Sequence, residues 1–257
     1  MLSVDEGAVN RMYTKAVESN SVTNKGLTRV KRGSLGSEVL NSIRDAIFSG
    51  KFQPGEQLKE IVIARDLGVS QATVREALVQ LENLGVVVRV PNAGSTVTRL
   101  SVEELKERVN LRVLLEGVAG CEAAQRMLTP DFDELETRLR DIVERVDEND
   151  YFGAAQADLR FHRYIWEKSG NRTLFRILDQ LIAPLFAFVS ILRSANFDPL
   201  RDPTSAHAPI ISALRSRDEA TIERAFKAAI EEGYGPYLSG PVNQQARALG
   251  FISGPRK

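Results

Sequence analysis

Val69-Ser70-Gln71-Ala72-Thr73-Val74-Arg75-Glu76-Ala77-Leu78 is the stretch that decides the fold of the first part of this chain. Ser70 is a residue type that caps helix N-termini. The apolar residues after it recur at the spacing of one buried helix face, namely Val74, Ala77, Leu78 and Leu81. The stretch therefore predicts a short helix that begins after Ser70 and ends at Leu84-Gly85.

Helical and strand patterns lie on both sides of this stretch. Apolar residues at helical spacing run from 37 to 47, and a shorter helical pattern runs from 59 to 67, after the turn signal Pro54-Gly55. Valines and threonines at 86–90 and 95–98 flank a Pro-Asn-Ala-Gly turn and predict a β-hairpin. Helix, helix, turn, helix and hairpin is the order of a winged helix-turn-helix, so we expect DNA binding.

Polar residues near the start of the central helix are the candidates for reading DNA. The apolar face of this helix is buried, so Gln71, Thr73 and Arg75 are expected to face outward. Arg and Gln bind base edges through paired hydrogen bonds, and Thr suits phosphates or thymine methyl groups. Free amides beside Ser70 also favour a phosphate. Each side chain taken alone is equally consistent with a solvated helix surface.

Two further segments are candidates for contacting the duplex. Gly94 and Thr96 lie near the hairpin tip, where they could approach the DNA backbone or the minor groove. Residues 1–33 show no sustained periodicity and predict a flexible arm. Residues 25–99 carry eleven basic against seven acidic side chains, and four basic ones cluster at the end of the arm: Lys25, Arg29, Lys31 and Arg32. Arg32 is thus a candidate DNA contact, although such clusters are commonly solvated tails.

The rest of the chain has helical patterns. A capping box at Ser101 and Glu104 opens the first helix, and further start signals follow at Thr129-Pro130, Asp150 and Asp202-Pro203. Gly and Pro residues after Gly233 predict a loose tail. The expected fold is mainly α, with four parts: a basic arm (1–33), a winged helix-turn-helix with a small β-hairpin wing (34–99), an all-α helical bundle (100–236) and a C-terminal tail (237–257).

The two histidines of the chain lie in this helical part. Asp158 and His162 stand four residues apart on one predicted helix, so both side chains project from the same face. A carboxylate and an imidazole at this spacing can hold one divalent metal, and His207 could add a third ligand. The alternative interpretation is an ordinary ion pair between Asp158 and His162.

The composition indicates a cytoplasmic protein. Cys121 is the only cysteine, so no disulfide within the chain is possible and a reducing compartment is expected. We identify no run of about 18 apolar residues, the length needed to span a bilayer. The N-terminus carries acidic residues and no apolar run, so it does not resemble a secretory signal.

Four motifs follow one another in the first part of the chain: Pro54-Gly55-Glu56-Gln57-Leu58, Leu67-Gly68-Val69-Ser70, Val74-Arg75-Glu76-Ala77-Leu78 and Gly94. In these motifs and their spacing, residues 35–99 resemble the DNA-binding domain of the GntR family of regulators. The resemblance implies that Arg75 and the position of Gln71 contact DNA and that Gly94 shapes the wing. The family commonly has Arg where this chain has Gln71. Because Arg prefers guanine and Gln prefers adenine, we expect a different base preference at that position.

The helical part contains Arg112-x3-Glu116, then Asp158-x2-Phe161-His162 before Gly170-Asn171, then His207-x5-Ala213-Leu214-x3-Asp218. In these motifs residues 101–235 are similar to the FCD ligand-binding domain of the FadR subfamily. This resemblance implies a helical bundle whose central cavity binds a small organic acid, often beside a metal held by one Asp and three His. The third His is expected 22 residues after His207, where Ala229 stands, and Glu232 lies nearly one turn further on. Three protein ligands still make a site for Zn²⁺, Ni²⁺ or Mn²⁺.

Two more residues are candidates for contacting the effector. Arg112 can bind a carboxylate through two hydrogen bonds, although an ion pair with Glu116, four residues on, is an equally good interpretation. Asn171 either lines the cavity or begins a helix after Gly170.

The sequence thus predicts a homodimeric regulator rather than an enzyme. We expect a repressor that binds a palindromic operator and whose operator affinity changes when a small carboxylate binds the helical part. Two alternatives stay open: a metal-dependent enzyme that uses Asp158, His162 and His207, and a DNA-binding protein whose helical part only dimerises.

Overall fold

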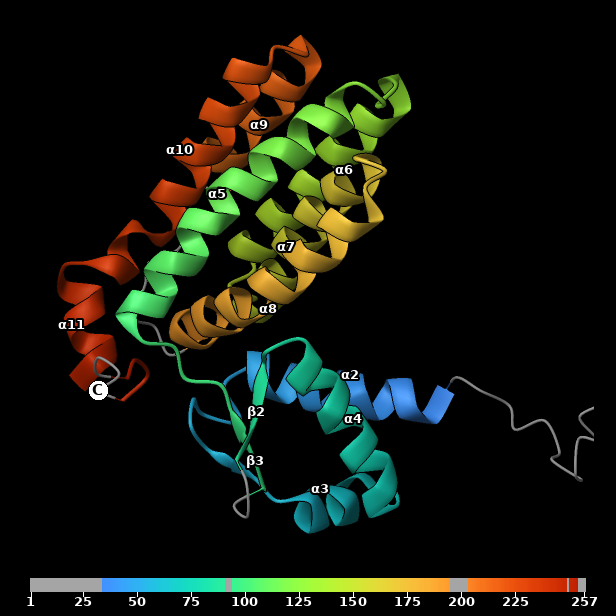
Figure 1. Cartoon of the computed structure of the whole chain (residues 1–257), viewed down its shortest axis with the longest axis vertical. Helices are drawn as coiled ribbons and strands as arrows, with labels where there is room; N and C mark the ends of the chain where they lie inside the picture. Colours follow the sequence, from blue (N-terminus) through green and yellow to red (C-terminus); the bar gives the residue numbers. More distant parts are fainter. Residues whose placement is uncertain (1–33, 91–93, 195–202, 249, 254–257) are drawn as a thin grey trace, which may run out of the picture. The chain divides into compact units, whose positions relative to one another are not determined.

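The structure is a computed structural model that describes residues 34–90, 94–194, 203–248 and 250–253. Its elements in chain order are α2 (Ser34–Phe48), β1 (Gln57–Leu58), α3 (Glu60–Leu67), α4 (Gln71–Asn83), β2 (Val87–Val90), β3 (Gly94–Val97), α5 (Val102–Ala124), α6 (Thr129–Asp147), α7 (Tyr151–Lys168), α8 (Arg172–Ser194), α9 (Pro203–Ser216), α10 (Glu219–Leu238) and α11 (Pro241–Ala248). Figure 1 shows these elements along the chain. The predicted fold class, a winged helix-turn-helix followed by an all-α part, is confirmed.

The winged helix-turn-helix consists of α2, α3, α4 and a three-stranded antiparallel sheet in the order β1-β3-β2. Its core contains Ile47 from α2, Val74 and Leu81 from α4, and Val87 from β2, all at most 1% exposed. The predicted hairpin pairs β2 with β3. Strand β1 was not expected from the sequence, because two residues are too few to show an alternating pattern.

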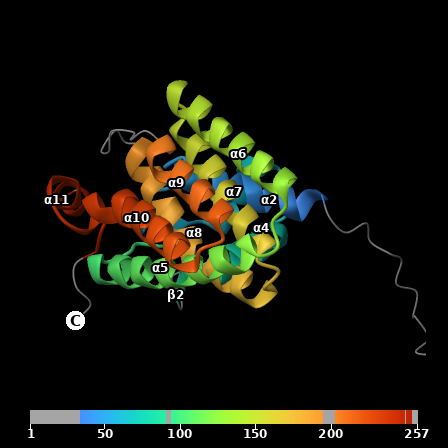
Figure 2. The same ribbon diagram turned by 90° about the horizontal axis from the view of Figure 1, so that it is seen from above.

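The helical part consists of α5 to α10, followed by α11. Helices α5 and α10 lie side by side, as both views show (Figures 1 and 2). At Gly120 the two helices are so close that a Cβ atom would meet Phe226 and Ile222 of α10 within 3 Å, so a larger residue there would push them apart. This close packing brings α10 to the helix that carries Arg112.

Helix α8 is the most apolar segment. By length and composition alone, residues 172–192 could cross a membrane, which the sequence analysis did not anticipate. A search for an unbroken apolar run does not find this segment, because charged residues interrupt the start of α8. The mean hydropathy of an 18-residue window is high in spite of them. In the structure 67% of that apolar window is buried, which is typical of a core helix.

The end of the chain differs from the predicted loose tail. Residues 241–248 form α11, which begins with Pro241, a favourable residue in the first turn of a helix. Asn243 and Ala246 of α11 are buried, and the Ser253 amide donates to the Leu100 carbonyl. Tertiary contacts therefore order a segment whose Gly and Pro content suggested otherwise.

Candidate functional site

Helix α4 presents the predicted DNA-reading residues. The Ser70 hydroxyl caps the helix by accepting from the Thr73 amide at 3.1 Å. Gln71 and Arg75 are exposed, as expected. Thr73 is only half-buried, and its hydroxyl lies within hydrogen-bond distance of the Ser70 hydroxyl at 2.8 Å. Gln71 and Arg75 are therefore the better placed of these residues to contact a base edge.

Glu60, the first residue of α3, holds both of these side chains. The Arg75 Nη2 group donates to Glu60 Oε2 at 2.8 Å, and Gln71 Nε2 donates to the same oxygen at 3.2 Å. The hydrogen bond from Arg75 is the main reason why the pKa of Glu60 is lowered. Glu60 was not predicted as part of this site, because the turn at Gly68 brings it to α4 from eleven and fifteen positions away.

The wing residues are only partly described. Gly94 begins β3 with φ of +85°, a conformation that favours glycine, and it is exposed. Thr96 is half-buried, and its hydroxyl donates to the Val88 carbonyl at 3.4 Å. Residues 91–93 of the turn and the candidate contact Arg32 lie outside the described residues.

A cavity of about 100 Å³ lies inside the helical part. Its wall contains the three predicted metal ligands, the position of the missing third histidine, the acidic residue after it and the predicted effector contact: Asp158, His162, His207, Ala229, Glu232 and Arg112. Helices α5, α7, α9 and α10 supply them. Sites for drug-sized ligands measure about 300–1,000 Å³, so this cavity suits a smaller molecule.

Asp158, His162 and His207 converge in this cavity. His207 Nε2 lies 2.6 Å from Asp158 Oδ1, and His162 Nε2 lies 3.7 Å from the same oxygen. One ligand atom from each residue lies within 4.8 Å of the other two, which is the spread that a shared metal ion requires. The predicted pairing of Asp158 with His162 is thus part of a three-residue cluster.

Acceptors near the other ring nitrogens orient both histidines toward Asp158. His207 Nδ1 lies 2.7 Å from the Pro203 carbonyl oxygen. His162 Nδ1 lies 2.9 Å from Glu116 Oε2, within ion-pair distance although its angle is not that of a hydrogen bond. Metal-binding histidines commonly have such an acceptor at the non-ligating nitrogen, so this donor set fits a divalent metal.

Burial and opposite charges set the ionisation of this cluster. Burial disfavours the charged forms of Asp158 and His207, but their mutual hydrogen bond and attraction outweigh it. The pKa of Asp158 is therefore lowered and that of His207 is raised. A proton on His207 Nε2 occupies the position that a metal would take, so protons and metal compete for Nε2.

Arg112 is both a cavity residue and the ion-pair partner of Glu116. Its Nε donates to Glu116 Oε1 at 2.7 Å, its Nη1 to the Tyr234 hydroxyl at 2.9 Å, and its Nη2 lies 3.2 Å from His162 Nε2. Burial alone would lower the pKa of Arg112, but the attraction of Glu116 and Tyr234 raises it. The contact of Tyr234 with Arg112 and the contact of Glu116 with His162 were not predicted, because both depend on long-range packing.

Asn171 is not among the residues that line this cavity. Its side-chain oxygen accepts from the Leu174 amide at 3.1 Å, and its Nδ2 lies 3.4 Å from Glu122 Oε1. Of the two interpretations made from the sequence, the structure supports the one in which Asn171 begins a helix.

Two protein-family models match the chain. The model described as "Bacterial regulatory proteins, gntR family" matches residues 35–97, and the FCD domain model matches residues 107–232. The chain belongs to the GntR family. It is a transcriptional regulator of this family with an FCD domain, so the resemblance inferred from the motifs is confirmed.

Relatives of this GntR regulator carry names of the same kind. It is 32% identical over 205 residues to the "Probable D-xylose utilization operon transcriptional repressor" of Paenarthrobacter nicotinovorans, covering 79% of this chain and 88% of the relative. It is 26% identical over 201 residues to the transcriptional repressor RspR of Escherichia coli K12, covering 76% and 85%. Among solved structures, E. coli McbR/YncC has a TM-score of 0.71 at 23% identity, covering 83% of this chain and 99% of that one. The two relatives are named as transcriptional repressors rather than as enzymes. The similarity to McbR supports the fold alone.

Proposed function

We propose that this GntR regulator represses transcription from a palindromic operator as a homodimer, and that a small carboxylic acid bound in the cavity changes its operator affinity. One observation carries the effector part: Asp158, His162 and His207 place ligand atoms within 4.8 Å of one another in a cavity whose wall also contains Arg112. Two relatives named as repressors support repression rather than activation of transcription. A cytoplasmic location, where the operator DNA lies, is part of the proposal.

Within this proposal, residues 34–99 bind the operator and residues 100–236 bind the effector and dimerise. Gln71 and Arg75 read base edges, while the Ser70 end of α4, Thr73, Gly94 and Thr96 approach the phosphate backbone. The arm 1–33, with Arg32, adds phosphate contacts. Deleting the arm should weaken operator binding and flatten its dependence on salt, as fewer phosphate contacts require.

A divalent cation held by Asp158, His162 and His207 would supply positive charge to the effector's carboxylate. Arg112 has five N–H donors, of which Glu116 and Tyr234 take two. The donor that faces His162 Nε2 would be released where the cation takes that nitrogen, so three would remain for a ligand. Glu116 and Tyr234 hold the guanidinium in place. Ala229 stands in the cavity wall where a third histidine is expected, so this chain offers three protein ligands.

An exposed apolar face of α5 supports dimerisation. Leu111, Leu114 and Val118 are 48%, 66% and 46% exposed, and their spacing places them along one side of the helix. A second copy of the chain is the proposed occupant, because a palindromic operator presents two equivalent half-sites. Leu114→Glu should convert the dimer to a monomer in analytical ultracentrifugation, and an unchanged sedimentation coefficient would place the dimer interface elsewhere.

Elemental analysis of the untagged protein tests the metal site. We expect close to one Zn²⁺, Ni²⁺ or Mn²⁺ per chain, lost in His162→Asn and retained in the exposed control Glu231→Gln. Ala229→His should bind the metal more tightly. Native protein without metal, together with a gain in Ala229→His, would mean that Arg112 and the cavity wall recognise the effector alone.

Fluorescence anisotropy tests the effector, using an operator selected from random DNA by the full-length protein. A panel of small carboxylic acids is added with and without the metal, and one acid should change the operator affinity. Arg112→Lys keeps the charge but loses the paired hydrogen bonds, so it should need more of that acid. If operator binding is indifferent to every acid and metal, the helical part serves dimerisation only.

A further inference from the structure

A second depression in the helical part shares no lining residue with the cavity. It is an open groove of about 1110 Å³ formed by α6, α7 and the start of α8. Its wall contains five arginines and one acidic side chain, Glu167: Arg138, Arg160, Arg163, Arg172 and Arg176. We call it the arginine groove. Nothing in the effector proposal makes use of it.

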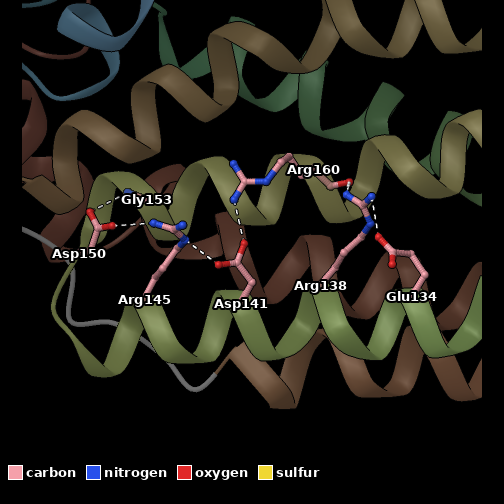
Figure 3. Close-up of polar contacts among 7 residues, drawn as sticks. All are labelled: Glu134, Arg138, Asp141, Arg145, Asp150, Gly153 and Arg160. Carbon is pink, nitrogen blue, oxygen red and sulfur yellow. Dashed lines mark hydrogen bonds and ion pairs between the residues drawn. The ribbon is translucent and has the colours of Figure 1, made fainter.

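Three of these arginines are held in place by neighbours. Arg138 and Arg160 belong to a row of ion pairs along α6 and α7 (Figure 3), in which they contact Glu134 and Asp141, each at 2.8 Å. Arg163 lies 3.3 Å from Asp179. Aromatic rings support two of the three guanidinium groups, because Arg138 lies over the Tyr164 ring and Arg163 over the Phe175 ring. This part of the groove is therefore held in place, and each of its three arginines has a carboxylate partner.

The other two arginines have no acidic partner among the described residues. Arg172 and Arg176 are four residues apart on the first turns of α8, so they project from one exposed face. Two unpaired guanidinium groups at this spacing repel each other, and an anion between them would remove that repulsion.

The wall also contains buried donors that lack acceptors. Trp166 is fully buried, and its Nε1–H has no hydrogen-bond partner among the described residues. The Nε of Arg138 is likewise buried and unpartnered. Leaving a buried donor without an acceptor destabilises a protein, so two such donors in one wall favour a ligand that brings acceptors. The N-terminus of α8, which begins beside Asn171 at the groove, adds a positive helix end.

We propose that the arginine groove binds a small anion carrying a phosphoryl group. A phosphoryl group offers three acceptor oxygens on one centre, which suits the planar donors of Arg172 and Arg176 together with the helix end. Arg172 and Arg176 supply the unpaired positive charge, and the volume of the groove, about 1110 Å³, leaves room for the rest of a phosphorylated metabolite. This site is independent of the cavity, so the regulator would take two chemically different ligands.

Trp166 makes the proposal directly measurable, because it is the only tryptophan in the chain. Inorganic phosphate is titrated into the full-length protein at an ionic strength held constant with KCl, and Trp166 emission is recorded. We expect a saturable change that KCl alone does not produce. In the double variant Arg172→Gln/Arg176→Gln, phosphate should bind at least tenfold more weakly. Isothermal titration calorimetry with phosphate should give the same ranking.

The matched control is Arg140→Gln/Arg224→Gln, which removes two exposed arginines that do not line the groove. It should bind phosphate within twofold of the native protein. Because the rings of Trp166 and His162 are 6.4 Å apart, phosphate in the cavity would also alter the emission. Unchanged binding in the Arg172→Gln/Arg176→Gln variant would therefore overturn the proposal and assign phosphate to the cavity, leaving the effector proposal standing.

A parallel measurement with duplex DNA distinguishes a free phosphorylated molecule from DNA phosphates as the ligand of the arginine groove. The Arg172→Gln/Arg176→Gln variant should lose phosphate binding but keep the native affinity for duplex DNA and its salt dependence. Loss of DNA affinity together with a smaller salt slope would assign these arginines to the DNA backbone and overturn the small-ligand proposal.

Discussion

Two of the Arg–Glu pairs among the described residues have nearly equal lengths but lie in opposite surroundings. Arg75 and Glu60 lie 2.8 Å apart on the helix-turn-helix, with side chains 57% and 23% exposed. Arg112 and Glu116 lie 2.7 Å apart beside the cavity, with side chains 3% and 0% exposed. Exposed pairs contribute roughly 0–1 kcal/mol, whereas removing one partner of a buried pair destabilises a protein by about 3–5 kcal/mol. Distance alone therefore does not say what an ion pair does.

The difference matches the proposed roles of the two regions. Because the exposed pair of Arg75 and Glu60 contributes little to stability, Arg75 can exchange it for DNA contacts without unfolding the domain. The buried pair instead fixes Arg112 and contacts His162, so the polar wall of the cavity keeps its arrangement before any ligand arrives.

The largest effect should follow from Glu116→Gln. It leaves the Arg112 charge buried without its carboxylate, so we expect a loss of about 3–5 kcal/mol in the free energy of unfolding by urea. Glu231→Gln is the matched control, because it breaks the exposed i,i+4 pair with Lys227 on α10 and should cost less than about 0.5 kcal/mol. Equal losses in the two variants would remove the energetic contrast between buried and exposed pairs.

Arg75→Ala should act on DNA rather than on the fold. We expect operator affinity to fall by about 10–100-fold, the equivalent of 1–3 kcal/mol for a base-contacting arginine. The free energy of unfolding should stay close to that of the native protein, since the lost pair with Glu60 is exposed. Anisotropy and urea unfolding measure the two quantities. A large stability loss with unchanged affinity would reverse the roles assigned to the pairs.

Gln71→Arg should change which base is preferred. At one position in each half-site, selected sequences should shift from adenine toward guanine, with discrimination of roughly 1–3 kcal/mol. Sequencing of sites selected by native and variant proteins measures the shift. If both proteins select the same sites, Gln71 does not read a base.

Glu60→Gln should have the smallest effect. It frees Arg75 and Gln71 and removes a negative charge from the proposed DNA face, so we expect a few-fold gain in operator affinity, measured by anisotropy. Reduced affinity would mean that Glu60 positions these side chains for DNA.

The Glu60 pair should also depend on pH. The pKa of Glu60 is lower in the folded protein than in the unfolded chain, where it is about 4.3. The small stability that the carboxylate contributes is thus present above that value and lost as the pH falls through the lower folded pKa. The stability difference between native protein and Glu60→Gln should therefore vanish in acid and persist at pH 7. A difference that grows in acid would contradict this assignment.

The interaction partners were harder to predict than the elements themselves. The cap at Ser70, the capping box at Ser101 and the helix start at Asp150 are short patterns in which a side chain meets an amide three positions on, and the structure contains all three. Strand β1 was not predicted, because two residues are too few to show a period. Helix α11 was not predicted either, because contacts with residues distant in the sequence stabilise it.

The sequence by itself determined the family, the fold class and the chemical types available: an Arg and a Gln on a helix after a cap, and one Asp and two His on helices. These follow from local spacing and composition, which act within a few residues along the chain. Only the tertiary structure decided that Glu60 holds Arg75, that Glu116 and Tyr234 surround Arg112, and that five arginines line one groove. Those contacts join residues from separate elements, and the packing of buried apolar faces, which sequence spacing does not encode pair by pair, brings them together.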